Sequence, residues 1–450
     1  MKNIFNNLIN ISLIIGLLFI GGCKKTKEDM SKAFVKYYGG LLEDTGVEVL
    51  QTGDGGYIIA GTTNTGSGPG DILIIKTDDE GNEKWHKTLG ADSVYDECGS
   101  IAIMPDGGYM IVGTTEYKVN RVFDVTALEI SKDSTCVFAA RMDAGGSVIW
   151  SKHYTNPSYS SVQVGAFGKS VAVNPNGQCF IAGMVDSSYG TPAVVNLNLY
   201  AFLIDYNGAE VMFAGNPVTP FQYGAQNQND YTNDAILAFD EGLGDEYIIS
   251  SSTIISGVNT PRLVKVRLNG GSILQNTART NLSWTQPTYY SGGEIIRTMD
   301  QNYMMTGTMG TPPTSSDIFM IKLLATDLSK ITSYSYGDHS GFKDLGVSVT
   351  LTNDGGYALL GVTNSTAFTG DATKLDDVLL IKVDGNGNEQ WHKTFGGRGN
   401  DSAAKIIQTS DGGYLICGTI SFGDDVSNTG VSNSITLIKV NSDGNLSNVK

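Results

Sequence analysis

The sequence predicts an all-β protein made of seven copies of one four-stranded unit, and three observations support this prediction. A block that reads Asp-Gly-Gly-Tyr followed by an apolar run recurs seven times, in some copies faintly. Between these blocks the apolar residues form short runs rich in β-branched and aromatic side chains, without a lasting helical period. Glycine is abundant, with 56 residues in a chain of 450, and it lies mostly where turns between strands are needed.

The composition narrows the class of protein further. Hydrophobic residues make up 40% of the chain, which excludes a disordered or collagen-like protein. The formal net charge is -16, so the basic surface expected of a nucleic-acid-binding protein is missing.

The N-terminus predicts a signal peptide over residues 1–22. The apolar run from Leu8 to Ile20 is about 13 residues long, whereas a membrane-spanning helix needs roughly 20. The stretch from Phe19 to Cys23 resembles a bacterial lipobox, which implies that Cys23 is the lipidated first residue of the mature chain. Cleavage without lipid is the alternative.

Residues 23–32 are polar and predict a lipidated tether before the folded body. Lys24 follows Cys23, where an Asp would resemble an inner-membrane retention signal, so the outer membrane is the expected location. Glu28 and Asp29 faintly resemble the acidic export signals of Bacteroidota surface lipoproteins, but the neighbouring lysines depart from that pattern. The periplasmic and cell-surface sides both stay open.

The repeats themselves predict a ring. Their mean spacing is about 60 residues, longer than the repeat of a helical-pair solenoid. The aromatic residue of each block is assigned to Tyr57, Tyr109, Phe180, Tyr247, Tyr303, Tyr357 and Tyr414.

Each copy contains four short strands in order, which in the first copy are Val47 to Gln51, Tyr57 to Thr62, Ile72 to Lys76 and Lys84 to Thr88. The second and third are continuous apolar runs, as expected where both faces of a sheet are covered. Small sheets stacked face to face in a ring form a β-propeller.

The chain ends predict how the ring closes. After Tyr414 the last copy lacks a fourth strand, whereas Phe34 to Gly40 matches the fourth strand of the sixth copy, Trp391 to Gly397. The N-terminal strand is therefore expected to complete the seventh blade, within a single propeller domain over residues 33–450.

The chain after Ala33 resembles the tandem-repeat β-propeller lipoproteins of Bacteroidota. The resemblance lies in the DGGY turns, the apolar Gly-Thr-Thr strands, the Asp-Ile/Val-Leu-x-Ile-Lys runs and the Asp-x-x-Gly-Asn-Glu-x-Trp turns. It implies the fold and an envelope location. It implies no shared activity, because propellers carry many functions.

A second motif precedes the fourth strand, as in Asp78-x-x-Gly81-x-x-x-Trp85. It resembles the Trp-docking repeat of quinoprotein dehydrogenases and, distantly, the sialidase Asp-box, but its spacing differs from both. We interpret it as a structural turn in which Asp accepts backbone amides and Trp packs on the next blade. The run from Asp384 begins like a calcium loop but fails the EF-hand register, so a hairpin turn is favoured over an adventitious calcium site.

Two further sets of charged residues repeat from blade to blade, which favours structural roles over catalysis. We interpret the acids as turn caps and the cations as snorkelling side chains. The acids lie 13 residues before the assigned aromatic: Asp44, Asp96, Asp234, Asp344 and Asp401. The cations end the third strands: Lys76, Arg141, Arg267, Lys322, Lys382 and Lys439.

No HExxH, GxSxG or P-loop motif occurs, so the sequence predicts no catalytic residue, no metal ligand and no cofactor. His86 and His392 share one fourth-strand position, hence the outer rim. Strand spacing predicts free, mostly buried thiols at Cys98, Cys136, Cys179 and Cys417.

The variable loops predict where a ligand would bind. The longest connect a fourth strand to the next blade near blades 3 to 5, and they are rich in aromatic and amide side chains that suit a sugar or an extended peptide. Packing of these loops upon themselves is the alternative. The candidate ligand-binding residues are Tyr223, Trp284, Tyr289 and Tyr290.

Together these observations predict an envelope-anchored, non-enzymatic binding or assembly module whose partner is a glycan or an outer-membrane protein. The alternative is a propeller enzyme, either a glycoside hydrolase or lyase, or a quinoprotein-like dehydrogenase. Clustered carboxylates with raised pKa values in the central channel would favour the hydrolase or lyase.

Overall fold

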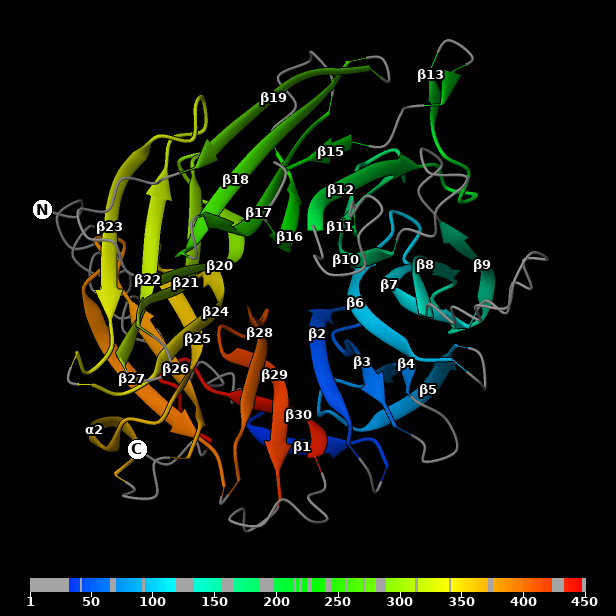
Figure 1. Ribbon diagram of the computed structural model, residues 1–450. Helices are drawn as coiled ribbons and strands as arrows, with labels where there is room; N and C mark the ends of the chain where they lie inside the picture. The colour runs from blue at the N-terminus through cyan, green and yellow to red at the C-terminus, as the bar shows by residue number, and fades with distance from the viewer. Residues whose placement is uncertain are drawn as a thin grey trace, which may run out of the picture.

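Seven four-stranded antiparallel sheets stand around a central channel in the computed structural model, so the protein is a seven-bladed β-propeller, as predicted (Figure 1). The structure describes residues 32–446 except for the segments 41–42, 65–69, 91–93, 119–132, 155–164, 187–196, 214–215, 218–220, 225–228, 239–244, 256–257, 270–271, 281–288, 312–314, 340, 371–374, 398 and 423–432.

Blades 1 to 4 follow one another along the chain. Blade 1 consists of β2 (Thr45–Gln51), β3 (Tyr57–Thr63), β4 (Asp71–Thr77) and β5 (Glu83–Leu89). Blade 2 consists of β6 (Asp96–Ile103), β7 (Tyr109–Lys118), β8 (Asp133–Met142) and β9 (Val148–Tyr154). Blade 3 consists of β10 (Ala166–Val173), β11 (Cys179–Asp186), β12 (Leu197–Ile204) and β15 (Phe221–Tyr223), with a small hairpin of β13 (Met212–Phe213) and β14 (Asn216–Pro217) before β15. Blade 4 consists of β16 (Asp230–Leu237), β17 (Glu246–Ile255), β18 (Val258–Asn269) and β19 (Ser272–Thr280).

Blades 5 to 7 complete the ring. Blade 5 consists of β20 (Tyr289–Arg297), β21 (Tyr303–Thr311), β22 (Ser315–Leu323) and β23 (Lys330–Tyr336). Blade 6 consists of β24 (Asp344–Leu351), β25 (Tyr357–Thr363), β26 (Asp377–Val383) and β27 (Glu389–Phe395), with the short helix α2 (Thr366–Thr369) between β25 and β26. Blade 7 consists of β28 (Ser402–Gln408), β29 (Tyr414–Ser421), β30 (Asn433–Val440) and the N-terminal strand β1 (Phe34–Tyr38).

The N-terminal strand closes the ring, as predicted. β1 pairs antiparallel with β30, and Phe34 lies opposite Lys439. This is the register in which Trp391 lies opposite Lys382 in blade 6. β1 therefore occupies the position of a fourth strand and covers the edge that β30 would otherwise expose.

The hydrophobic core lies between neighbouring blades. β3 and β4 are buried along almost their whole length, and their side chains pack with those of blade 2. One such cluster joins Ile58 and Ile74 of blade 1 to Ile111 and Ala140 of blade 2. The continuous apolar runs thus arise because each sheet is covered on both faces.

The turns before the fourth strands behave as predicted. Asp78 accepts the backbone N–H groups of Glu80 and Asn82 at 2.9 and 2.8 Å. Trp85 packs so closely on Gly146 of the next blade that a Cβ there would lie 3.0 Å from the indole ring. Asp384, where the sequence resembled a calcium loop, makes the same pair of turn hydrogen bonds.

The cations that end the third strands do not snorkel, and this part of the interpretation is wrong. Lys76 is buried and donates to Asp54 of the DGGY turn at 3.0 Å. The DGGY aspartate is thereby held against the third strand of its own blade. The same pairing joins Arg141 to Asp106, Lys322 to Asp300, Lys382 to Asp354 and Lys439 to Asp411, whereas Arg267 pairs with Glu246.

The aspartates at the entry to the first strands cap turns in three blades. Asp44 accepts the N–H of Gly40 at 2.6 Å, and Asp401 accepts that of Gly397 at 3.0 Å. Asp344 accepts the N–H of Asp338 at 3.1 Å.

The sequence register was wrong in blades 3 and 4, because the aromatic of blade 3 lies one residue later than in blade 1 and the first connection of blade 4 is longer. Cys179, not Phe180, takes the position of Tyr57, because it pairs with the end of β10 as Tyr57 pairs with the end of β2. In blade 4, Asp230 takes the entry position, and Asp234 lies four residues further along β16. Asp234 is therefore not a turn cap.

Two smaller predictions concern the thiols and the histidines, and a further finding concerns membrane-spanning helices. Cys98, Cys136, Cys179 and Cys417 are free and buried, as predicted. His86 and His392 each pair at 2.7 Å with a glutamate three residues earlier on an outer strand. Within the described residues, none of the helices has the length and apolar character needed to cross a membrane.

Candidate functional site in the central channel

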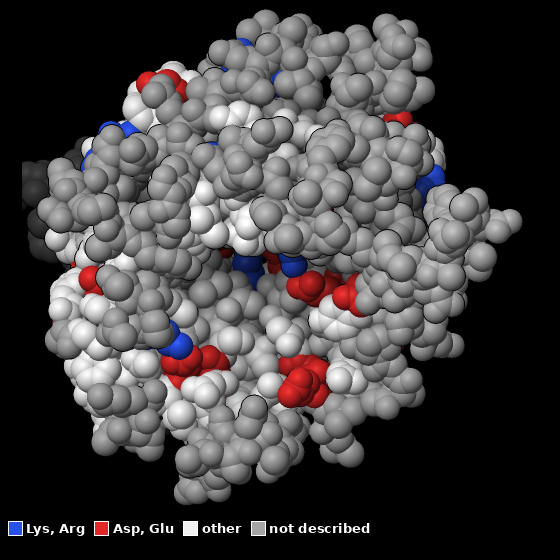
Figure 2. Space-filling view, in the orientation of Figure 1, with Lys and Arg blue, Asp and Glu red and all other residues white. Residues whose placement is uncertain are grey.

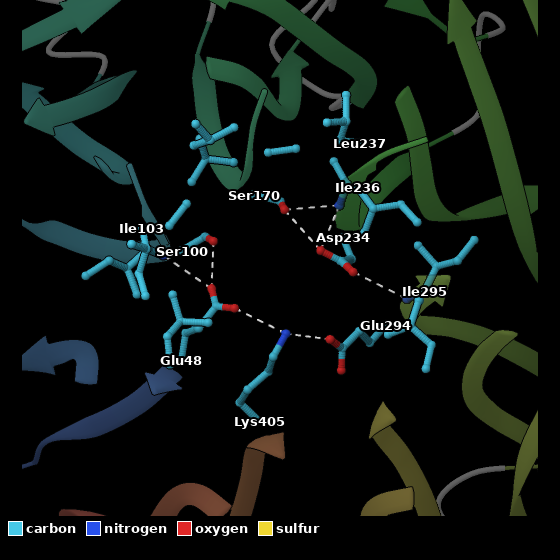
Figure 3. Close-up of a pocket in the computed structure, with 18 of the residues that line it drawn as sticks. Glu48, Ser100, Ile103, Ser170, Asp234, Ile236, Leu237, Glu294, Ile295 and Lys405 are labelled. Atoms are coloured by element: carbon cyan, nitrogen blue, oxygen red, sulfur yellow. Dashed lines mark hydrogen bonds and ion pairs between the residues drawn. The ribbon is translucent and has the colours of Figure 1, made fainter. Parts of the chain in front are cut away.

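A ring of seven side chains lies at one level of the channel, one from the first strand of each blade. Each first strand has a β-bulge at this level, and the bulge turns the next side chain toward the channel. All seven positions are polar. We call them the polar ring, and they are Glu48, Ser100, Ser170, Asp234, Glu294, Ser348 and Lys405. All of them except Ser348 are labelled in Figure 3.

The polar ring joins neighbouring blades through the backbone. At five of the seven junctions a ring side chain accepts the N–H of the residue that follows the ring position in the next blade. These bonds satisfy buried amides and align the first strands with one another. They join Ile101 to Glu48 at 3.2 Å, Ala235 to Ser170 at 3.0 Å, Ile295 to Asp234 at 3.3 Å, Val349 to Glu294 at 3.0 Å and Ile406 to Ser348 at 3.1 Å.

Lys405 is the cation of the polar ring. Its ammonium group forms ion pairs with Glu294 and, at 3.2 Å, with Glu48, so it connects blade 7 with blades 5 and 1 (Figure 3). Burial opposes the charge on Lys405, but Glu294, Glu48 and Asp234 outweigh it and raise the pKa of the ammonium group above its usual range. Lys405 is therefore charged at any physiological pH.

The environment of the polar ring disfavours the ionised form of two of its three carboxyl groups. Burial raises the pKa of Asp234, with Glu48 adding to the effect and Lys405 opposing it. Burial also raises the pKa of Glu294, again against the influence of Lys405. Ionised carboxylates at these positions depend on the nearby ammonium group.

A cavity of about 520 Å³ lies on one side of the polar ring. Its walls come from the residues that follow the ring position along the first strands, so it lies between the ring and the face that carries the DGGY turns. Side chains of blades 1 to 5 form these walls, and Arg297 also lines the cavity. Acidic and basic side chains are visible at the centre of the molecule (Figure 2).

Of the predicted ligand-binding residues, Tyr223 is the one whose side chain the structure describes, and it is not among the described residues that line this cavity. Tyr223 lies in β15 and packs half-buried against blades 3 and 4, with the Arg262 guanidinium 5.2 Å from its ring centre. Tyr289 and Tyr290 begin β20 and pair with Gly310 and Met309, so they belong to a strand and not to a loop.

The other two predicted residues, Trp284 and Cys23, lie outside the described residues. The site prediction at the variable loops thus stays a prediction.

Sequence reasoning missed the polar ring, although a signal was present. Five of its members lie nine residues before the assigned tyrosine of their blade, at Glu48, Ser100, Glu294, Ser348 and Lys405. Because the residue type changes from acid to hydroxyl to amine, the position does not look like a repeat. The longer connection in blade 4 and the shifted aromatic in blade 3 hid the other two.

No protein-family model matches the chain, and no curated protein matches it. Among solved structures it is similar to the Dos1 propeller, with 9% identity, a TM-score of 0.47 and coverage of 93% of this chain and 97% of that one. It is also similar to a protein of unknown function from Dyadobacter fermentans DSM 18053, with 10% identity, a TM-score of 0.45 and coverage of 90% and 99%. A third is the propeller domain of the Trilobed protease from Pyrococcus furiosus, with 9% identity, a TM-score of 0.43 and coverage of 91% and 96%. Similarities this low say nothing about function.

Proposed function

We propose that this propeller is a non-enzymatic binding module of the bacterial cell envelope and that its ligand enters the central cavity. The observation that carries the proposal is the cavity of about 520 Å³, which has mainly apolar walls above a polar floor. A concave, mostly apolar site with a few convergent polar groups is the usual form of a small-molecule site.

The state of the carboxylates favours binding over catalysis. Glu48 uses one oxygen for Lys405 and the other for Ser100 and Ile101. Asp234 and Glu294 likewise accept hydrogen bonds on both oxygens. A glycoside hydrolase needs a carboxyl group that carries a proton for the leaving group, whereas the oxygens of these three groups all act as hydrogen-bond acceptors.

The second candidate function is a glycoside hydrolase or lyase, and a specific observation favours it. Asp234 and Glu294 are clustered carboxyl groups with raised pKa values in the channel. Incubation with envelope and plant polysaccharides, read by new reducing ends and by absorbance of unsaturated products, tests it. Activity that is lost in Glu294→Gln but kept in Asp79→Asn would replace the binding proposal. A quinone absorbance in the purified protein would instead indicate the quinoprotein-like alternative.

The cavity is tested with a filled variant. Ala102 lines the cavity on blade 2, so Ala102→Phe should occupy it. A metabolite library is screened by thermal shift on the wild type and on Ala102→Phe. Compounds that raise the melting temperature of the wild type alone would support binding in the cavity. A library in which every stabilising compound acts equally on both proteins would contradict it.

The proposed address is the outer membrane, through lipid on Cys23. The apolar run before Cys23 and the polar tether after it support this address. The side of the membrane stays open between periplasm and cell surface.

A glycan or outer-membrane protein at the variable loops is a further part of the proposal. It rests on Tyr223, Trp284, Tyr289 and Tyr290. Copurification from native membranes and a glycan array on the body from residue 32 test it, with the quadruple alanine variant expected to lose the partner. An unchanged partner in that variant would move the search to the cavity.

A further inference from the structure

The geometry points to an aliphatic primary monoamine as the ligand of the central cavity, with its ammonium group on Asp234 and its hydrocarbon chain along the apolar walls. This inference rests on the proposed function, because it names the chemical class that the proposed cavity would bind. Three observations support it: the charge of the floor, the character of the walls and the position of Arg297.

The floor lacks a second cation. The polar ring contains three carboxyl groups and one ammonium group, and Lys405 pairs with Glu48 and Glu294. Asp234 instead accepts from neutral donors, namely Ser170 Oγ at 3.1 Å and the N–H groups of Ala235 and Ile295 at 2.8 and 3.3 Å. Within the described residues no Lys, Arg or His forms an ion pair with Asp234.

A ligand ammonium group would supply what Asp234 lacks. A carboxylate in a poorly solvated site gains most from a charge-assisted hydrogen bond, which is shorter and stronger than a neutral one. Burial works against the charge on Asp234, so a cation that enters the cavity removes an existing penalty. A neutral or anionic ligand offers no such gain.

The side chains of the cavity walls determine which kind of ligand chain fits beside them. Leu50, Ala102, Ala172, Ile236 and Ile296 line the cavity above the floor. All are aliphatic, and no aromatic side chain is among the described lining residues. Sugars in protein sites usually stack on aromatic rings, whereas a saturated chain is stabilised by aliphatic contact alone.

Arg297 restricts the ligand to one amine. It lines the same cavity on β20, three residues beyond Glu294, which corresponds to about 10 Å along a strand. A ligand with its ammonium group at the floor would bring a second ammonium group toward this guanidinium. Monoamines should therefore bind better than diamines of the same chain length.

Isothermal titration calorimetry tests the inference with four six-carbon probes, which are titrated into the propeller domain that begins at residue 32. Hexylamine should bind at least tenfold more tightly than 1-hexanol, hexanoate or 1,6-diaminohexane. Asp234→Asn, in which the amide oxygen still accepts a hydrogen bond, should reduce hexylamine affinity at least tenfold. Asp79→Asn, an exposed acid on an outer turn, is the matched control and should not change it.

The outcomes separate this inference from the proposed function. Equal affinity for hexylamine and 1-hexanol, or full hexylamine affinity in Asp234→Asn, would overturn the amine while leaving a cavity that binds other compounds. Should Asp234→Asn fail to fold, Ala102→Phe decides, because it fills the cavity and leaves the floor intact. Hexylamine binding that survives Ala102→Phe would overturn the inference. If, in addition, every library compound that stabilises the wild type stabilises Ala102→Phe equally, the proposed function is contradicted as well.

Discussion

At the scale of single residues, position within the blade determines what a charged side chain does. Asp54 on a DGGY turn holds Lys76 of its own blade, whereas Asp234 on a first strand faces the channel. Chemically identical groups therefore have opposite environments. Burial works against the charge on Asp54, but hydrogen bonds from Thr52, Lys76 and Lys84 together outweigh it and hold the pKa of Asp54 below its usual range, whereas burial raises the pKa of Asp234.

The first residue-scale prediction concerns Lys405. Lys405→Met should lower the free energy of unfolding by about 3–5 kcal/mol, the usual cost of leaving buried carboxylates without their cation. Urea denaturation at pH 7 measures it. Lys84→Met, which removes an exposed partner of Asp54, should change stability by less than about 1 kcal/mol. Equal effects of the two substitutions would show that the polar ring does not depend on Lys405.

The second residue-scale prediction concerns Asp344, whose pKa is raised to about 6 by burial and by the nearby Asp338 and Asp317, against hydrogen bonds from Thr363 and the Asp338 amide. An unfolded Asp has a pKa near 3.9, so the folded chain binds this proton more tightly. The free energy of unfolding should therefore fall as the pH rises from about 4 to about 6, by roughly 3 kcal/mol at most for this group.

Asp344→Asn removes this titration and should flatten the stability profile between pH 4 and 7. Urea denaturation across that range measures it, with Asp79→Asn as the control. Asp401 shifts in the same direction, to about 6, so the single variant should retain part of the slope. If the stability of Asp344→Asn changes with pH in parallel with that of the wild type, the raised pKa is not that of Asp344.

At the scale of elements, each strand owes its stability mainly to neighbours on both sides. The aromatic at the start of a fourth strand packs over the turn glycine of the next blade. Phe34 of β1 does this at Gly81, as Trp391 of β27 does at Gly444. β1 is thus integrated into the ring although it comes from the other end of the chain.

Deleting residues 33–40 should therefore expose the edge of β30, lower the melting temperature and promote association of chains. Differential scanning calorimetry and size-exclusion chromatography measure both effects. Deleting residues 24–31, which leaves β1 intact, is the control. A monomer with unchanged melting after loss of β1 would rule out the closure.

The strands could be predicted because their signals are local, and the candidate site could not because its signal is spread around the ring. Tyr57 and the Asp-Gly-Gly turn before it predict a hairpin, because the residues that define the turn are neighbours in the sequence. Glu48 and Lys405, by contrast, are 357 residues apart and meet only when the ring closes. The shift of Asp234 by four residues came from a longer connection in blade 4, which no local pattern could reveal.

At the scale of the whole molecule, the ring presents two ends with different character. The cavity lies toward the DGGY face, where five residues join the first and second strands in six blades and eight residues join them in blade 4. The connections of variable length lie on the opposite face. A ligand in the cavity and a partner on the loops would therefore approach from opposite sides.

The proposed membrane anchor concerns the whole molecule. We expect that native protein isolated from membranes carries lipid on Cys23. Intact mass spectrometry of the membrane fraction measures it directly. Cys23→Ser should release the protein into the soluble fraction, because the only proposed membrane contact is lost. A Cys23→Ser protein that still partitions with the membrane would contradict the prediction. Cys417→Ser, which changes a buried thiol of the propeller, is the control.

The pairing of β1 with β30 also means that the folded ring does not depend on which blade the chain begins with, as long as the blades keep their cyclic order. The two described ends, near residues 32 and 446, belong to one sheet, so a short linker could join them. New termini could then open at the connection between β5 and β6, giving a circular permutant with the same interblade contacts. Such a permutant should bind hexylamine as the parent does, because Lys405, Glu48 and Asp234 would still meet around the same axis.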